Sequence, residues 1–172
     1  MSKFEAIILS GGKGTRVSKF TKKIPKCLID INGRPFLYYQ LKFLKKNGIE
    51  NIIISVGYKA QKIKDYVANN IDFLNIKIID DGKKLLGTGG AVLKSLKLLK
   101  SNFFIIYGDS YLNFNINKLK KNNNIANMAV FKNNNKFDKS NIDFKSNKKI
   151  IYYKNTDNED LKYIDYGASY LN

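Results

Sequence analysis

The sequence predicts an α/β fold in which helices cover both faces of a mostly parallel sheet, a Rossmann-like three-layer α/β/α arrangement. Two observations carry this prediction. Strand-length apolar segments alternate with segments of helical periodicity, and glycine-rich turns follow strand ends. The expected strands span 4–9, 51–56, 76–79 and 103–107, and the expected helices span 35–47, 59–69, 88–100 and 115–121. Folds of this class bind ligands at the carboxyl ends of their strands.

The first strand leads directly into a glycine-rich turn. Three of the four residues in 11–14 are glycines, whose amide groups can approach an anion closely because they carry no Cβ. The turn ends on Thr15 and Arg16, which offers a bidentate fork, and Lys26 adds a point charge beyond it. We therefore predict a nucleoside-triphosphate site.

Two commoner phosphate loops do not fit this turn. A Walker loop needs Gly-Lys-Ser/Thr after four residues, whereas Gly12-Lys13 comes too early and is followed by Gly14. A dinucleotide fingerprint needs a third glycine where this chain has Val17.

The next segments continue the α/β pattern. After Lys26 we expect a short strand, an Asn32-Gly33 turn, and a helix that begins at Pro35 and ends at Gly48. A second glycine-rich segment follows at 86–91.

This second glycine segment introduces a helix, and the strand after it carries a carboxylate. Thr88 is the expected N-cap of a helix over 91–99. The buried strand 103–107 then places Gly108 and Asp109 at its carboxyl end.

The last third of the sequence is less regular. Residues 120–139 are rich in Asn and Lys, apart from a predicted strand at 125–131. Residues 148–154 are expected to form one strand of an appended hairpin, and 163–171 the next strand.

These motifs, in this order, resemble the sugar-1-phosphate nucleotidylyltransferases, which share the Gly-Gly-x-Gly-Thr-Arg turn, the downstream Pro-Lys, the second glycine segment and the Gly-Asp strand end. The resemblance implies the nucleotide-diphospho-sugar transferase fold and transfer of a nucleoside monophosphate from a triphosphate to a sugar 1-phosphate, with release of pyrophosphate. It also implies Mg²⁺ as cofactor, and the triphosphate and the sugar 1-phosphate as binding partners.

The resemblance further implies roles for individual residues. Arg16 would grip the leaving pyrophosphate, Lys26 the α-phosphate, and Asp109 the magnesium ion. Lys154 and Gly167 would meet the sugar phosphate, although Tyr153 replaces the glutamate that relatives carry before this lysine. The residues expected to bind the nucleotide are Leu9, Gly11, Gly12, Gly14, Thr15, Gly87 and Thr88.

The base remains open at this stage. Thymidylyl and uridylyl relatives place a glutamine a few residues before the second glycine segment, whereas this chain has residues 80–83, Asp-Asp-Gly-Lys. The Leu-Gly-Thr-Gly-Gly-Ala segment most resembles the branch that contains heptose 1-phosphate guanylyltransferases, which act in bacterial envelope polysaccharide synthesis.

We expect residues 1–172 to form a single nucleotidyltransferase domain that lacks the family's C-terminal segment. Relatives continue past the strand at 163–171 and supply a second metal-binding aspartate there. The sequence therefore predicts a chain that binds nucleotide with little turnover, or a non-catalytic homologue. It also predicts an exposed final strand whose apolar surface could support a homo-oligomer.

The composition argues against several kinds of site and several classes of protein. The chain has one cysteine, Cys27, and no histidine, which removes disulfides, zinc clusters and imidazole catalysis. The absence of an 18-residue apolar run and of a cleavage region argues against a membrane span and a secretion signal, so we expect a cytoplasmic protein.

The formal charge of +17 would favour a nucleic-acid-binding protein, but the excess is nearly all lysine. We interpret it as solvated helix faces and expect no nucleic-acid partner. A cytidylyl or guanylyl transferase with a non-sugar acceptor is the remaining alternative.

Overall fold

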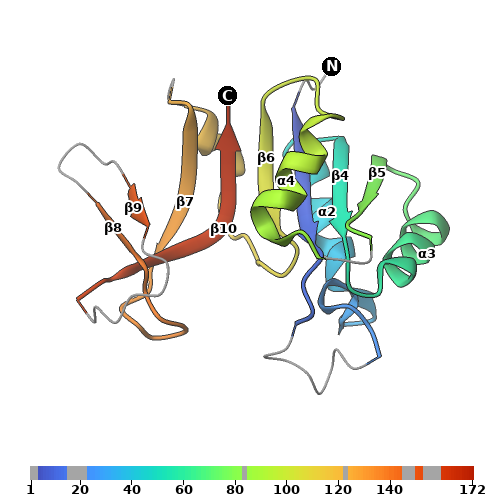
Figure 1. Ribbon diagram of the computed structural model, residues 1–172, viewed down its shortest axis with the longest axis horizontal. Coiled ribbons are helices and arrows are strands. Elements are labelled where there is room, and N and C mark those ends of the chain that lie inside the picture. The colour runs from blue at the N-terminus through green and yellow to red at the C-terminus, as the bar shows by residue number, and fades with distance from the viewer. Residues whose placement is uncertain (1–3, 15–22, 83–84, 122–123, 145–149, 153–159) are drawn as a thin grey trace.

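The computed structural model describes residues 4–14, 23–82, 85–121, 124–144, 150–152 and 160–172. Within these ranges, eight strands form one sheet in the order β5-β4-β1-β6-β10-β8-β9, with β7 paired to β10 (Figure 1). The elements are β1 Glu5–Ser10, η2 Lys26–Leu28, β2 Asp30–Ile31, β3 Arg34–Pro35, α2 Phe36–Lys46, β4 Asn51–Val56, α3 Ala60–Asn70, β5 Asn75–Asp80, α4 Gly87–Leu96, β6 Phe103–Tyr107, η3 Ile116–Lys120, β7 Ala126–Lys132, β8 Ile142–Phe144, β9 Ile150–Tyr152 and β10 Tyr163–Leu171.

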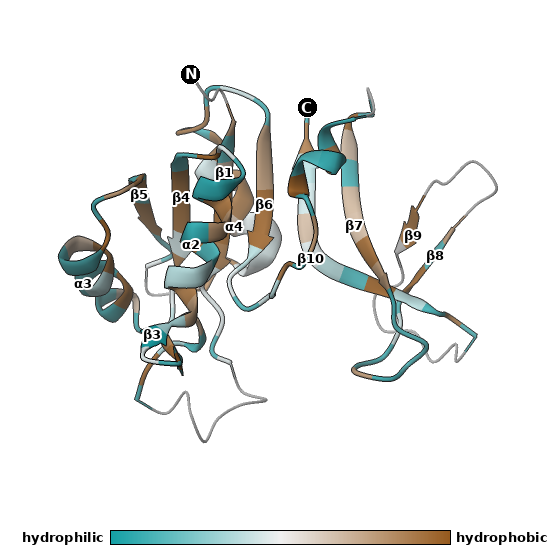
Figure 2. Ribbon diagram, turned by 180° about the vertical axis from the view of Figure 1, so that it is seen from behind, coloured by the Kyte–Doolittle hydropathy of each residue, from teal (hydrophilic) through white to brown (hydrophobic). Residues whose placement is uncertain are grey.

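The parallel half of the sheet confirms the predicted α/β class. Strands β5, β4, β1 and β6 run parallel, and Ile7 of β1 stands between Ile53 of β4 and Ile105 of β6. These strands are rich in isoleucine and phenylalanine because both of their faces are covered, as buried parallel strands require (Figure 2).

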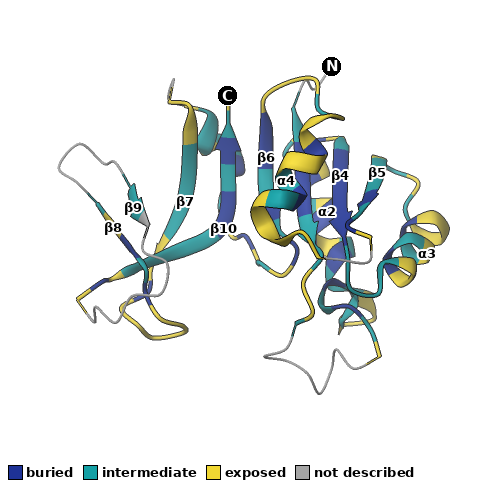
Figure 3. Ribbon diagram, in the orientation of Figure 1, coloured by how far each residue is buried: buried dark blue, intermediate teal, exposed yellow. Residues whose placement is uncertain are grey.

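Two hydrophobic clusters form the layers on either side of this half. Ala6 and Ile8 of β1 pack in one cluster with Leu41 of α2 and Ile63 of α3. Ile7 points to the other face, where α4 covers a cluster that includes Ile53, Phe103 and Val92 (Figure 3). Alternate residues of one strand therefore enter different layers, and the three-layer arrangement is confirmed.

The helix α2 and the turn before it form as predicted. Asn32 and Gly33 adopt φ values of 51° and 81°, which a tight two-residue hairpin between β2 and β3 requires. Pro35 precedes the first helical residue, and Gly48 beyond the last turn has φ 76°, a conformation that favours glycine.

Three local predictions need correction. Thr88 does not cap a helix over 91–99, because α4 already begins at Gly87, whose φ of 69° allows the abrupt turn into the helix. The segment predicted as a helix at 115–121 is a short 3₁₀ helix, η3, whose first turn is held by the Asn115 side chain accepting from the Asn117 amide. The short strand expected directly after Lys26 begins with the 3₁₀ turn η2, and only two residues of β2 follow.

The antiparallel half is built around β10, which pairs with β6 along 168–171, with β7 along 163–165 and 169–171, and with β8 at Tyr163. Strand β7 confirms the prediction at 125–131, and β9 lies within the predicted 148–154. Strand β8, which pairs with β9, was not predicted.

The expectation of an exposed final strand is wrong. Strand β10 lies inside the sheet, and Ala168 and Tyr170 are buried there. Both edges of β10 are therefore paired with neighbouring strands, and its other residues are buried or half-buried. Along the described part of the chain, every helix is too short or too polar to cross a bilayer.

Candidate nucleotide-binding site

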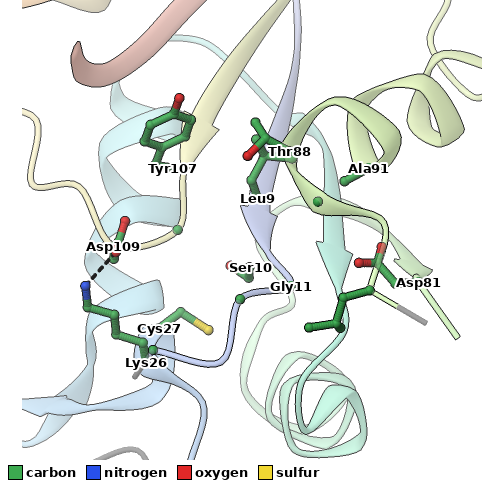
Figure 4. Close-up of a pocket in the computed structure, with 15 residues that line it drawn as sticks. Leu9, Ser10, Gly11, Lys26, Cys27, Asp81, Thr88, Ala91, Tyr107 and Asp109 are labelled. Atoms are coloured by element: carbon green, nitrogen blue, oxygen red, sulfur yellow. Dashed lines mark hydrogen bonds and ion pairs between the residues drawn. The ribbon is translucent and has the colours of Figure 1, made fainter. Parts of the chain in front are cut away.

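A cavity of about 480 Å³ lies at the carboxyl ends of β1 and β6, beside the start of α4 (Figure 4). The predicted segments meet here because the carboxyl ends of parallel strands lie at one edge of a sheet. The residues that line it are Leu9, Ser10, Gly11, Gly12, Gly14, Lys26, Cys27, Asp81, Leu85, Gly87, Thr88, Ala91, Tyr107, Gly108 and Asp109.

Eight of the predicted site residues share this cavity: Leu9, Gly11, Gly12, Gly14, Lys26, Gly87, Thr88 and Asp109. Three others, Thr15, Arg16 and Lys154, lie outside the described residues. Gly167 is not part of the lining, and its amide donates to Asp165 Oδ1 at 2.8 Å. A Cβ at Gly167 would overlap Ser110 Oγ and lie 3.4 Å from Tyr107 Cβ, so Gly167 packs behind a residue of the lining.

At one end of the cavity, Lys26 Nζ lies 2.6 Å from Asp109 Oδ2. The lysine comes from η2 and the aspartate from the residue pair after β6. Their side chains are 38% and 43% exposed, and an ion pair this accessible contributes only about 0–1 kcal/mol to folding. Both charged groups are therefore available to a ligand at low cost.

Gly108 allows β6 to end close to β1. Its amide donates to Leu9 O at 2.9 Å. A Cβ at this position would overlap Ser10 Oγ and lie 2.8 Å from Leu9 O, so a larger residue would force the two strand ends apart. This close approach is what directs Asp109 into the cavity.

The loop after β6 is held from behind by Gln40 of α2. Its Nε2 donates to Tyr107 O at 2.8 Å and to Ser110 O at 3.1 Å. The Tyr107 hydroxyl in turn donates to Asp165 Oδ2 of β10 at 2.8 Å. These bonds fix the backbone on both sides of Asp109. Helix α2, which supplies Gln40, and strand β10, which supplies Asp165, were both predicted from the sequence.

A second close approach surrounds Asp81 at the far end of the cavity. The ideal Cβ position of Gly11 is 3.0 Å from Asp81 Oδ2, and that of Gly57 is 3.2 Å from the same atom. The Tyr58 amide donates to Gly11 O at 3.1 Å and joins the glycine turn to the end of β4. Gly14 has φ 63°, so the turn also needs a glycine to bend away.

Cys27 forms part of the wall rather than a reactive group. The residue is buried, and burial raises the pKa of its thiol to about 11, with Ser10 beside it lowering the pKa by a smaller amount. The thiol is therefore protonated at neutral pH and is a poor nucleophile.

The sequence profile of the Nucleotidyl transferase family matches residues 5–137, which hold every segment of this cavity. The chain belongs to the Nucleotidyl transferase family. A D-glycero-alpha-D-manno-heptose 1-phosphate guanylyltransferase of Campylobacter jejuni is 41% identical over 136 residues, which are 78% of this chain and 60% of the relative. An Aneurinibacillus thermoaerophilus protein of the same name is 37% identical over 67% of this chain and 50% of its own length.

A solved structure of HddC from Yersinia pseudotuberculosis complexed with GMP-PN superposes with a TM-score of 0.78 and 27% identity. The match covers 97% of this chain and 76% of the HddC chain. The chain spans about half to three fifths of the length of these two curated relatives.

The residues that the structure describes hold no cluster of three or more metal-binding side chains. Asp109 nevertheless fits a magnesium ligand, because it lines the cavity half exposed and its ion-pair partner Lys26 is also partly exposed. Mg²⁺ usually binds through one or two carboxylates together with substrate phosphates and water. A single carboxylate beside the glycine-rich turn meets that requirement if the turn binds phosphates, as predicted from the sequence.

Sequence reasoning gave no role to Asp81, Cys27, Tyr107, Leu85 and Ala91, which also line the cavity. A usable signal existed for Asp81, which follows the predicted strand 76–79 as Asp109 follows 103–107. The rule that ligands bind at strand ends applies equally to both aspartates.

Proposed function

We propose that this chain binds a nucleoside triphosphate, GTP in particular, and transfers its nucleoside monophosphate to a sugar 1-phosphate of the heptose type. One observation carries the proposal: the glycine turn, the Lys26–Asp109 pair and the second glycine segment, far apart in sequence, line one cavity. The heptose guanylyltransferase relatives and the GMP-PN complex of HddC support the choice of sugar and base.

The reaction needs alignment and charge neutralisation more than acid–base chemistry. An oxygen of the sugar phosphate, already anionic, attacks the α-phosphorus and forms a new P–O bond. The bond from the α-phosphorus to the bridging oxygen breaks, and pyrophosphate leaves with its electron pair. No general base is needed, which agrees with a sequence that has no histidine and a cavity whose only thiol is protonated.

Different residues neutralise the negative charge on different phosphates of the triphosphate. The amides of the turn 11–14 wrap the phosphates, Lys26 leaves Asp109 to neutralise the α-phosphate, and Arg16 grips the departing pyrophosphate. Asp109 would hold Mg²⁺, which when bound neutralises phosphate charge. Lys154 is proposed to meet the sugar phosphate, and Gly167 to shape this side of the site from behind Tyr107.

Pyrophosphate release tests the proposal. The chain is incubated with Mg²⁺, each of GTP, CTP, UTP, dTTP and ATP, and each of a panel of sugar 1-phosphates that includes a heptose 1-phosphate. We expect release that requires both substrates and is fastest with GTP. The Asp109→Asn variant is the control for contaminating activity. Release that is absent from every pair, or that is independent of the sugar phosphate, would contradict the proposal.

A further inference from the structure

Asp109 lies in a tight turn that one buried side chain holds at both ends. The Ser110 amide donates to Tyr107 O at 3.1 Å, which closes residues 107–110 into a turn with Asp109 in its third position. Gln40 of α2 donates through its Nε2 atom to Tyr107 O at 2.8 Å and to Ser110 O at 3.1 Å. One amide group therefore binds the carbonyls of the first and the last residue of the turn.

The partners of Gln40 determine which way its amide faces. Both partners are carbonyl oxygens, which only accept hydrogen bonds, so the NH₂ group must face them and supplies one N–H to each. The other end of the amide, Oε1, is buried and has no hydrogen-bond partner among the residues that the structure describes. An unpaired buried oxygen costs folding free energy.

This cost sets Gln40 apart from its neighbours on α2. The other buried residues of the helix are Leu37, Leu41 and Leu44. A fourth leucine at position 40 would avoid the unpaired oxygen, but it would leave the turn without its two donors. The residue type at this position is therefore explained by what it does for the turn and not by the packing of the core.

The turn is also bordered by open space. Tyr107, Gly108 and Asp109 line the nucleotide cavity, whereas Ser110 and Gln40 line a second cavity of about 960 Å³. A loop between two cavities has few packing contacts that fix its backbone, so its hydrogen bonds carry more of that task. The two bonds from Gln40 are among the few restraints on the direction of the turn.

We infer that Gln40 is a positioning residue for the magnesium ligand Asp109, whose carboxylate it directs by holding both ends of the turn. The inference rests on the proposed function, in which Asp109 holds Mg²⁺ beside the triphosphate. Mg²⁺ demands near-ideal octahedral geometry with oxygen distances of about 2.0–2.1 Å, so a small rotation of the turn is enough to weaken its binding. Gln40 does not line the nucleotide cavity, and it therefore acts on the cation only through Asp109.

The effect of Mg²⁺ on GTP binding measures this role. GTP is titrated into the chain by calorimetry in saturating Mg²⁺ and, separately, in EDTA, with no sugar phosphate present. The dissociation constant in EDTA divided by that in Mg²⁺ gives the coupling between cation and nucleotide. Gln40→Met keeps the length of the side chain and removes both donors. We expect it to lower this ratio about 10-fold and to change GTP binding in EDTA by less than about twofold.

Two control variants separate this role from a loss of stability. Gln61→Met changes the only other glutamine of the chain, which is exposed on α3 and donates to Asp65 Oδ1 at 2.7 Å. Leu41→Val removes a buried methylene group from α2 beside Gln40 and leaves both hydrogen bonds to the turn in place. Both variants should keep the ratio of the unmodified chain.

A second substitution covers the case in which methionine prevents folding. In Gln40→Glu the ionised carboxylate has the shape of the amide and no donor, so the same fall in the ratio is expected. If neither variant folds, Gln40 has a purely structural role and the inference is overturned.

The remaining outcomes distinguish the inference from the proposed function. If Gln40→Met keeps the ratio of the unmodified chain, or if Leu41→Val lowers it equally, Gln40 only stabilises the fold and the inference is wrong, while GTP binding stands. If the unmodified chain binds GTP equally well with and without Mg²⁺, Asp109 holds no cation and the inference is also wrong. If the unmodified chain binds no GTP in either condition, the proposed function fails and the inference fails with it.

Discussion

Lys26 Nζ and Asp109 Oδ2 lie 2.6 Å apart, although 83 positions separate the two residues in the chain. Each is the ion-pair partner of the other, and each is expected to bind a different part of a magnesium nucleotide. Binding therefore exchanges partners: the lysine turns to a phosphate and the aspartate to the cation. Because the pair is partly exposed, breaking it costs little folding energy.

Asp109→Asn is expected to abolish magnesium-dependent turnover, by about 100-fold or more, while changing the unfolding free energy by less than about 1 kcal/mol. The amide cannot replace the negative charge, but an exposed side chain at a strand end carries little of the core. Pyrophosphate release and thermal unfolding measure the two quantities. Asp72→Asn, which alters an exposed aspartate between α3 and β5, is the control. Unchanged turnover in Asp109→Asn would assign the residue a structural role.

Gly108→Ala should destabilise the fold by about 1–3 kcal/mol, because the new methyl group would overlap Ser10 Oγ and press on the Leu9 carbonyl. Gly89→Ala is a matched control of opposite sign. A Cβ at Gly89 meets nothing within 4 Å inside helix α4, so alanine there should stabilise the fold by about 0.5–1 kcal/mol. Urea unfolding compares the two variants, and equal shifts in the same direction would contradict the packing argument.

The stability of the chain should fall between pH 9 and pH 11 because of Cys27. Burial raises the pKa of its thiol from 9.0 to about 11, so in this window the unfolded chain loses a proton that the folded chain keeps. The contribution is complete below pH 9 and is lost at about 1.4 kcal/mol per pH unit above it.

Cys27→Ser removes this titration and leaves the surface lysines unchanged. The difference in unfolding free energy between the two proteins, measured in urea at pH 8, 9, 10 and 11, should therefore shrink as the pH rises. A constant difference across this range would show that the thiol is not held protonated by the fold.

Arg16→Lys should lower kcat/KM by the equivalent of about 1–3 kcal/mol, because lysine keeps the charge and loses the bidentate fork. The only other arginine, Arg34, is exposed and lies over the Tyr38 ring at 5.1 Å, so Arg34→Lys is the natural comparison. Steady-state kinetics of both variants with the preferred substrates measure this loss of kcat/KM. Equal activity of Arg16→Lys and the unmodified chain would remove the role of the fork.

The parallel half could be predicted because its signals are local. Apolar runs such as 103–107 define buried strands, and strand ends in parallel sheets meet at one edge, which brought the two glycine segments and Asp109 together. The Lys26–Asp109 contact itself could not be predicted, since it depends on side-chain positions in two distant loops. Asp81 was not predicted because it belongs to none of the motifs that carry the resemblance.

Strand β8, the start of α4 and the partners of β10 could not be predicted, for physical reasons. Strand β8 has only three residues, Ile142–Phe144, in an Asn- and Lys-rich stretch too short to show a period of two. The start of α4 was misplaced because Thr88 has the chemistry of a cap, whereas the positive φ of Gly87 decides where the helix begins. The strands that pair with β10 lie far from it in the sequence, and the sequence alone does not give the register of such pairs.

The position of β10 also determines the order in which the sheet can close during synthesis. Strands β6, β7, β8 and β9 leave the ribosome before β10, yet β10 is the strand that lies between β6 and the rest of the antiparallel half. Until it emerges, the apolar segment Phe103–Tyr107 has one unpaired edge. A nascent chain therefore passes through a stage that favours edge-to-edge association, and this stage ends when β10 pairs with β6.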